Sequence, residues 1–112
     1  MGGDRMNDEA NMLRMQKQFT DLVDHIVHDK NREVIHAVIP RLDRATFSKM
    51  AHSVANLRVK YIALSVQLAS AEPFTPQMAG QLKAMREQFE EARAGFDAVK
   101  RAIIRGYIDL AD

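Results

Sequence analysis

Ala71-Glu72-Pro73-Phe74-Thr75-Pro76 is the stretch that decides the fold, because no helix crosses its two prolines. Over residues 47–68, apolar side chains recur at alternating steps of three and four, and the same alternation runs over residues 78–103. This spacing marks helices whose apolar seam follows a 3.5-residue repeat. The sequence therefore predicts two long helices that fold back on each other as an antiparallel heptad hairpin.

The two hairpin helices have definite expected limits. The first is expected from about residue 44 to 70. The second begins with Thr75 as N-cap and Pro76 in its first turn, where the missing N–H costs nothing, and it can continue to about Leu110. A helix of about 35 residues is roughly 50 Å long. Its end therefore projects past the hairpin, and the first helix, residues 34–39 or a second subunit must cover it.

A third helical segment precedes the hairpin. Residues 12–26 repeat the alternation of three and four, and Asn7 or Asp8 is expected to cap this helix. We expect residues 1–7 to be a disordered leader and residues 8–112 to form a single helical domain. The seam residues of this segment are Met12, Met15, Phe19, Leu22 and Ile26.

Residues 33–39 are ambiguous, because their β-branched side chains favour a strand whereas the i,i+4 spacing of the valines and isoleucines favours a helix. A lone strand would find no partner elsewhere in the chain, so we expect a short helical segment around 32–39. Pro40 ends it, and residues 41–45 form a connector.

The expected fold is an all-α three-helix bundle built on the hairpin. Charges beside the seams support this arrangement, since the third helix carries Arg86, Arg93 and Lys100 at seven-residue intervals and the first helix carries Asp21 and Asp24. Flanking charges select partners in helical bundles. We therefore expect the first helix, from this chain or from a neighbour, to lie along both hairpin helices.

Composition limits the classes of function. The chain has 112 residues, no cysteine and a net charge of +1. Disulfides, thiolate metal sites and cysteine nucleophiles are therefore excluded, and no net field selects nucleic acid or an anionic membrane. The longest uncharged run, residues 61–71, is too short for a membrane-spanning helix of about 20 residues. We expect a cytoplasmic protein without a membrane or nucleic-acid partner.

Asp21, His25 and His28 are the best candidates for a metal site. At positions i, i+4 and i+7 they fall within about 60° of one another on a helix, and His36, His52 or a second chain would supply a fourth zinc ligand. The spacing is not a recognised zinc signature, and polar residues on a solvated face are the simpler interpretation. We therefore predict no metal and no cofactor, and keep this site as an alternative.

Other possible chemistry has weaker support. Glu33 and His36 match the Glu-x-x-His element of di-iron bundles, but that site needs a second copy that the sequence lacks. The serines have no Gly-x-Ser-x-Gly context, and no phosphate-binding glycine loop exists, so we predict no catalytic residue and no enzymatic activity. A basic run offers phosphate contacts without helix-turn-helix spacing or stacking aromatics. Its members are Arg41, Arg44, Lys49, Arg58 and Lys60.

The hairpin also carries more apolar surface than one partner covers. Val59, Ile62 and Val66 form a stripe away from the seam, and the overhanging helix adds Ile104 and Ile108. Left exposed, these side chains would form a larger patch than soluble monomers usually show. We therefore predict a two-fold homodimer with these five residues at its interface.

The sequence thus favours a non-enzymatic helical interaction protein, such as an adaptor, small chaperone or regulatory scaffold, that acts through a self-associating bundle. One alternative is a metal- or cofactor-binding bundle that uses Asp21, His25 and His28. The other is a nucleic-acid-binding protein that uses the basic residues between 41 and 60, and its binding would fall steeply with salt.

Overall fold

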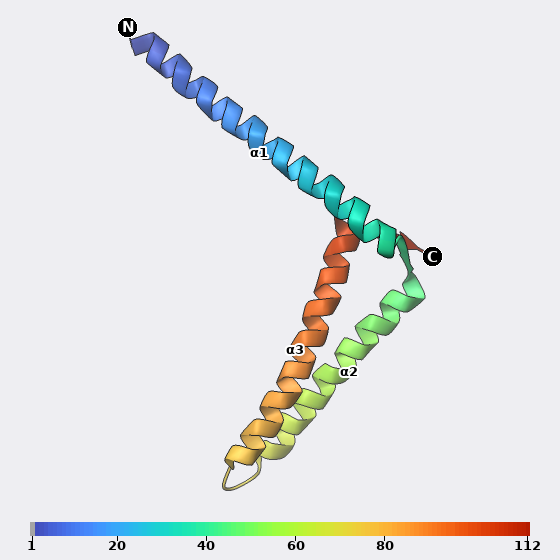
Figure 1. Ribbon diagram of the computed structural model, residues 1–112. Coiled ribbons are helices and arrows are strands. Elements are labelled where there is room, and N and C mark those ends of the chain that lie inside the picture. The colour runs from blue at the N-terminus through green and yellow to red at the C-terminus, as the bar shows by residue number, and fades with distance from the viewer. Residues whose placement is uncertain (1) are drawn as a thin grey trace.

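The computed structural model describes residues 2–112, with side chains from Arg5 onward. Three helices contain 82% of the chain. α2 and α3 lie side by side and are joined by a tight turn, whereas α1 projects from the open end of this pair (Figure 1). The all-α class and the antiparallel hairpin are therefore confirmed. In chain order the elements are α1 (Gly2–Val38), β1 (Arg41–Asp43), α2 (Arg44–Ala69), α3 (Pro76–Ile104) and β2 (Asp109–Ala111).

The contact between α2 and α3 follows the two predicted seams. Every seam residue is buried or half-buried, and Val54 and Leu68 are the most enclosed side chains of α2. The rings of Phe47 and Phe96 lie 5.0 Å apart, which joins the start of α2 to the later turns of α3. Apolar burial along this line holds the hairpin together.

Both hairpin helices begin with a side-chain cap. The Asp43 carboxylate accepts a 2.7 Å hydrogen bond from the Thr46 backbone N–H, which lowers the pKa of Asp43. The Thr75 hydroxyl accepts from the Met78 N–H at 3.2 Å, and Pro76 follows in the first turn, as predicted. These bonds satisfy amide groups that a helix leaves unpaired at its N-terminus.

The first helix is longer than its apolar pattern indicated. α1 runs unbroken from Gly2 to Val38, so the predicted helical segment around 32–39 is the last part of α1. Pro40 follows the end of the helix, as expected. The predicted leader over residues 1–7 begins at Met1, which lies outside the described residues, and the backbone from Gly2 onward is helical.

α3 ends at Ile104, six residues before the predicted limit at Leu110. Gly106 adopts a φ of +78°, its N–H donates to the Ile103 carbonyl at 3.0 Å, and the Tyr107 N–H donates to the Ala102 carbonyl at 2.8 Å. This pair of bonds is a Schellman motif, which closes a helix with a left-handed glycine. The glycine therefore serves as a stop signal and not as a residue inside the helix.

The residues after this stop form a small sheet that the sequence did not predict. β2 pairs in parallel with β1, in the register Leu42 opposite Leu110, and the Asp109 N–H donates to the Pro40 carbonyl at 3.1 Å. The expected connector, residues 41–45, thus supplies a strand. Three-residue strands are too short to produce a recognisable sequence period.

The first helix does not lie along the hairpin within one chain. α1 runs away from α2 and α3, and its contacts with the remainder of the chain are near its C-terminal end (Figure 1). The radius of gyration is 23.8 Å, compared with about 13 Å for a compact domain of this size. The expected packing of the first helix along the hairpin is therefore not found within the described part of the chain.

A charge in the seam tests the hairpin. We expect Val54→Asp to unfold the chain, because an unpaired buried carboxylate costs several kcal/mol and total stability is only about 5–15 kcal/mol. Asn56→Asp places the same group on the exposed face of α2 and should leave the thermal melt nearly unchanged. Equal melting curves for the two variants, measured by circular dichroism, would contradict the seam.

The helix stop has its own test. We expect Gly106→Ala to lower the free energy of unfolding by about 1 kcal/mol, because alanine is strained at this positive φ. A Cβ at this position meets no atom within 4 Å, so the loss reflects backbone conformation alone. Gly95 lies inside α3, and a Cβ there also meets no atom within 4 Å. Gly95→Ala should therefore raise the free energy of unfolding slightly in the same urea titration.

Candidate interaction surface

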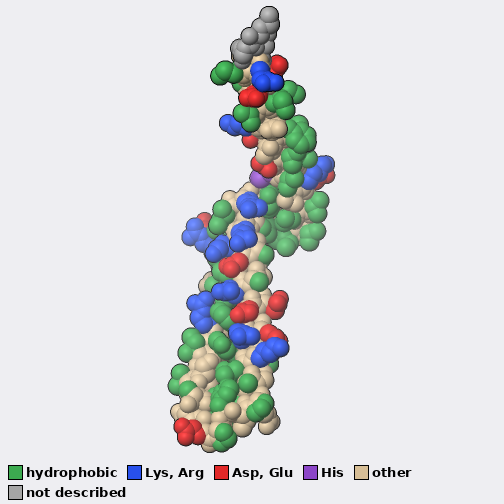
Figure 2. Space-filling view, turned by 90° about the vertical axis from the view of Figure 1, so that its left-hand side faces the viewer, with side chains coloured by type: hydrophobic (Ala, Val, Ile, Leu, Met, Phe, Trp, Pro, Cys, Tyr) green, Lys and Arg blue, Asp and Glu red, His purple; other side chains and the backbone are tan. Residues whose placement is uncertain are grey.

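The largest uncovered apolar surface lies on α1. Its side chains occupy an arc of about 200° on the helix, at 100° per residue, and Phe19 is 66% exposed. The predicted seam of the first helix is thus present but has no partner in the chain. Figure 2 shows hydrophobic side chains along this helix above the hairpin. We call this arc the α1 face, and it comprises Met6, Met12, Leu13, Met15, Phe19, Leu22, Val23, Ile26 and Val27.

A second uncovered stripe lies on α2, where it was predicted. Val59, Ile62 and Val66 are more than half exposed, and Ile104 at the end of α3 is 75% exposed. Ile108 differs from the prediction, because it is only 3% exposed. It follows the helix stop and is enclosed within the chain, so it is not available for an interface.

A groove with a mixed lining runs between α2 and α3. Its apolar part is formed by Ala51, Val54 and Ala55 of α2 and by Phe96 of α3. The whole groove, which is lined by side chains from residues 51–58 and 93–100, has a volume of about 310 Å³. Ala55 begins the exposed α2 stripe, so the groove and the stripe form one continuous apolar strip. The hairpin therefore offers a long surface for another helix.

Basic side chains border this groove. The guanidinium groups of Arg58 and Arg93 lie 5.3 and 5.7 Å from the centre of the Phe89 ring, one from each helix. Such cation–π contacts hold an arginine over an aromatic face by attraction between its charge and the ring quadrupole, and they leave its net positive charge in place. Lys100, further along α3, is paired with Asp97 at 3.6 Å. Figure 2 shows Lys and Arg side chains gathered over the hairpin on the face in view.

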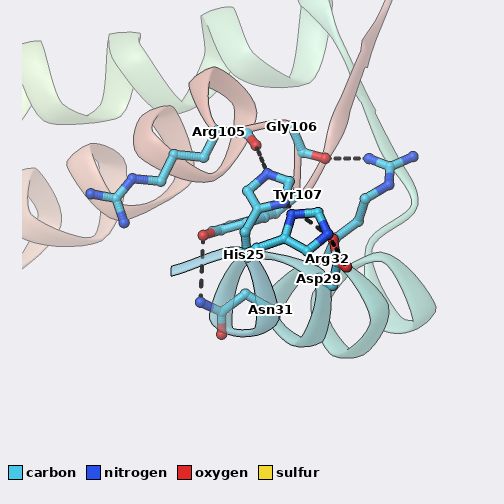
Figure 3. Close-up of polar contacts among 8 residues, drawn as sticks. His25, Asp29, Asn31, Arg32, Arg105, Gly106 and Tyr107 are labelled. Carbon is cyan, nitrogen blue, oxygen red and sulfur yellow. Dashed lines mark hydrogen bonds and ion pairs between the residues drawn. The ribbon is translucent and has the colours of Figure 1, made fainter. Parts of the chain in front are cut away.

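A polar junction fixes the angle between α1 and the hairpin. His28 donates from Nε2 to the Arg105 carbonyl at 2.9 Å, and Arg32 donates to the Gly106 carbonyl (Figure 3). These carbonyls belong to the end of α3, where a helix leaves acceptors unpaired and carries partial negative charge. Basic side chains of one helix therefore cap the C-terminus of another.

Tyr107 fills the space beneath this junction. Its side chain is buried, its ring centre lies 5.2 Å from that of His28, and its hydroxyl accepts a 3.4 Å hydrogen bond from Asn31. Of the apolar side chains predicted to project past the hairpin, Tyr107 is thus covered by the C-terminal half of α1, one of the three covers proposed, whereas Ile104 stays exposed. Figure 3 shows Asn31 and Arg32 of α1 directed toward Tyr107 and Gly106, respectively.

Asp109 completes the junction on the strand side. The His36 ring lies 3.1 Å from its carboxylate, and Arg32 lies 3.5 Å from it. The hydrogen bond with His36 and the charge of Arg32 lower the pKa of Asp109. Sequence reasoning missed this role, because His36 and Asp109 lie 73 positions apart and neither belongs to a recognisable motif.

The structure separates the candidate metal ligands. His25 pairs with Asp29 at 3.2 Å and not with Asp21, whereas His28 is used at the junction. Within the part of the chain that is described, no three His, Asp or Glu side chains are placed to hold a metal ion. Of the Glu-x-x-His pair, Glu33 contacts Lys30 at 3.1 Å and its histidine contacts Asp109.

The basic residues of the predicted phosphate-binding run do not converge. Arg44 pairs with Asp112 at 2.7 Å, and Arg58 lies over the Phe89 ring. Arg41, Lys49 and Lys60 are exposed at separate points of β1 and α2. Among the described side chains, none of these five forms an ion pair with an acidic residue of α1.

Comparison with known proteins gives no match, since no protein-family model, curated protein or solved structure matches the chain. None of the helices described is both long and apolar enough to cross a membrane. The function is therefore inferred from the surfaces of the chain itself.

The junction predicts a pH dependence. Because the pKa of Asp109 is lowered on folding, its stabilising contribution is present above the unfolded value of 3.8 and is lost as the pH falls through the lower folded value. We expect Asp109→Asn to lower the melting temperature at pH 6 and to converge with the parent as the pH falls below 3.8. Asp24→Asn, on the exposed part of α1, should show no such convergence in the same melts.

Proposed function

We propose that this chain is a helical interaction protein that works as a self-associated bundle, in the manner of an adaptor, small chaperone or regulatory scaffold. In this proposal it has no catalytic site, and its function lies in the surfaces that join copies of the chain. The proposal rests on the amount and the arrangement of its exposed apolar surface. The chain is assigned to the cytoplasm, whose reducing conditions suit a protein without cysteine.

The main support for the proposal is the solvent-accessible surface area of the chain. The chain exposes 9013 Å², whereas a folded monomer of its mass, 12.7 kDa, exposes about 6,200 Å². The excess is about 2,800 Å² per chain. Permanent homodimers commonly bury about 2,000–5,000 Å² in total, counted over both subunits. The combined excess of two copies, about 5,600 Å², is of the same order as one extensive interface between them.

The physics of a single helix supports the same proposal. In water, isolated helices are only marginally stable, and helices in proteins are stabilised chiefly by packing an apolar face. Residues 5–24 of α1 make no such contact within the chain, yet they carry an apolar arc from end to end. Coiled-coil packing of this arc against another copy would supply the missing stabilisation.

Molecular mass in solution tests this proposal. At tens of micromolar, we expect light scattering to give twice the chain mass of 12.7 kDa. Phe19→Glu should weaken the dimer about a hundredfold, because the interface would bury an unpaired charge at a cost of a few kcal/mol. Ile62→Glu should act in the same way through the α2 stripe.

Two controls place a glutamate at exposed polar positions, where the charge changes by one unit at Gln18 and by two at Lys60. Gln18→Glu adjoins Phe19 but lies outside the α1 face, and Lys60→Glu lies near the α2 stripe. Both should retain the parent mass. A parent mass of 12.7 kDa across this concentration range would contradict the proposal.

A further inference from the structure

We propose that the groove between α2 and α3 receives α1 of a second copy of this chain. Each copy would then complete a three-helix bundle with the first helix of the other. This inference rests on the proposed self-association and names the two surfaces that meet.

The shape of the α1 face selects this arrangement. Its arc of about 200° is wider than the narrow seam that two paired helices share, and it suits a helix that contacts two others at once. The hairpin offers such a double surface, because the groove is lined by both helices and continues into the exposed stripe of α2. Pairing of α1 with α1 would leave Val59, Ile62 and Val66 uncovered.

The charges at the two surfaces are complementary. Between Met6 and Val27, the charged side chains within the arc of the α1 face are acidic: Asp8 and Glu9 near its N-terminal end and Asp24 at one edge. Lys17 lies about 20° beyond that edge and Arg14 farther away. The groove is bordered by Arg58 and Arg93, and neither forms an ion pair with a carboxylate among the described side chains. Charges at the edge of an apolar contact direct the choice of partner.

The helix that fills the groove must come from another chain. The junction holds the C-terminal half of α1 against residues 105–109, and α1 continues without a break, so its N-terminal half points away from its own hairpin (Figure 1). Residues 5–24 span about 30 Å, and α2 spans about 39 Å. A second α1 is therefore long enough to cover most of the groove and stripe. A two-fold axis makes the exchange reciprocal.

Site-directed photo-cross-linking tests the proposal directly. The chain has no cysteine, so Ala55→Cys gives one attachment point, at the groove, for a benzophenone maleimide. This variant is refolded together with ¹⁵N-labelled parent chain, illuminated and digested, and mass spectrometry then identifies the cross-linked peptides. We expect the groove site to capture residues 8–27 of the ¹⁵N chain. Gln88→Cys, an exposed position on the other flank of α3, is the matched control and should lose this product.

Other outcomes separate the two proposals. Capture of α2 or α3 of the ¹⁵N chain would show a hairpin-to-hairpin dimer, and capture of α1 within the same chain would show a closed monomer. A dimeric mass without capture of α1 would also overturn the groove assignment, while leaving self-association intact. A monomeric mass would overturn both.

Discussion

The hydrogen bond from the Tyr107 N–H to the Ala102 carbonyl, 2.8 Å long, ends α3 and turns the chain out of the helix. The remainder of the structure depends on this turn. It places Tyr107 and Ile108 where α1 can enclose them, and it presents the Arg105 and Gly106 carbonyls to basic side chains of α1. A helix that continued to Leu110 would hide these carbonyls in its own hydrogen bonds and offer α1 no site of attachment.

Attachment at one end makes α1 a rigid arm. Its C-terminal half is held by capping bonds, by the Tyr107 ring and by the short sheet next to it. Its N-terminal half has only the intrahelical bonds of a single helix. Those bonds alone leave a helix marginally stable in water. Both the N-terminal half of α1 and the exposed stripe of α2 would therefore be stabilised by burial of their apolar side chains. Each lacks the apolar partner that the other presents.

The sequence predicted the features that repeat and missed those that occur once. The alternating seams on both sides of Pro73 determined the hairpin, and the cap at Thr75 fixed the start of α3, because each signal is local. The predicted helix limit at Leu110 passed over Gly106, although a glycine after an apolar run with basic residues in its last turn is a stop signal. The contact of His36 with Asp109 joins segments that are distant in the sequence, so no local sequence pattern predicts it.

The direction of α1 follows from how the chain passes from α1 to α2. Pro40 fixes its own φ and favours an extended backbone at Ile39. Residues 41–43 are held by their parallel pairing with β2. The connection therefore lacks the freedom to reverse α1 onto its own hairpin without opening both the ladder and the junction. Intramolecular and exchanged packing would bury similar apolar surfaces, so these connecting contacts decide between them. The exchanged form keeps every one of these contacts, and it requires only a second copy of the chain.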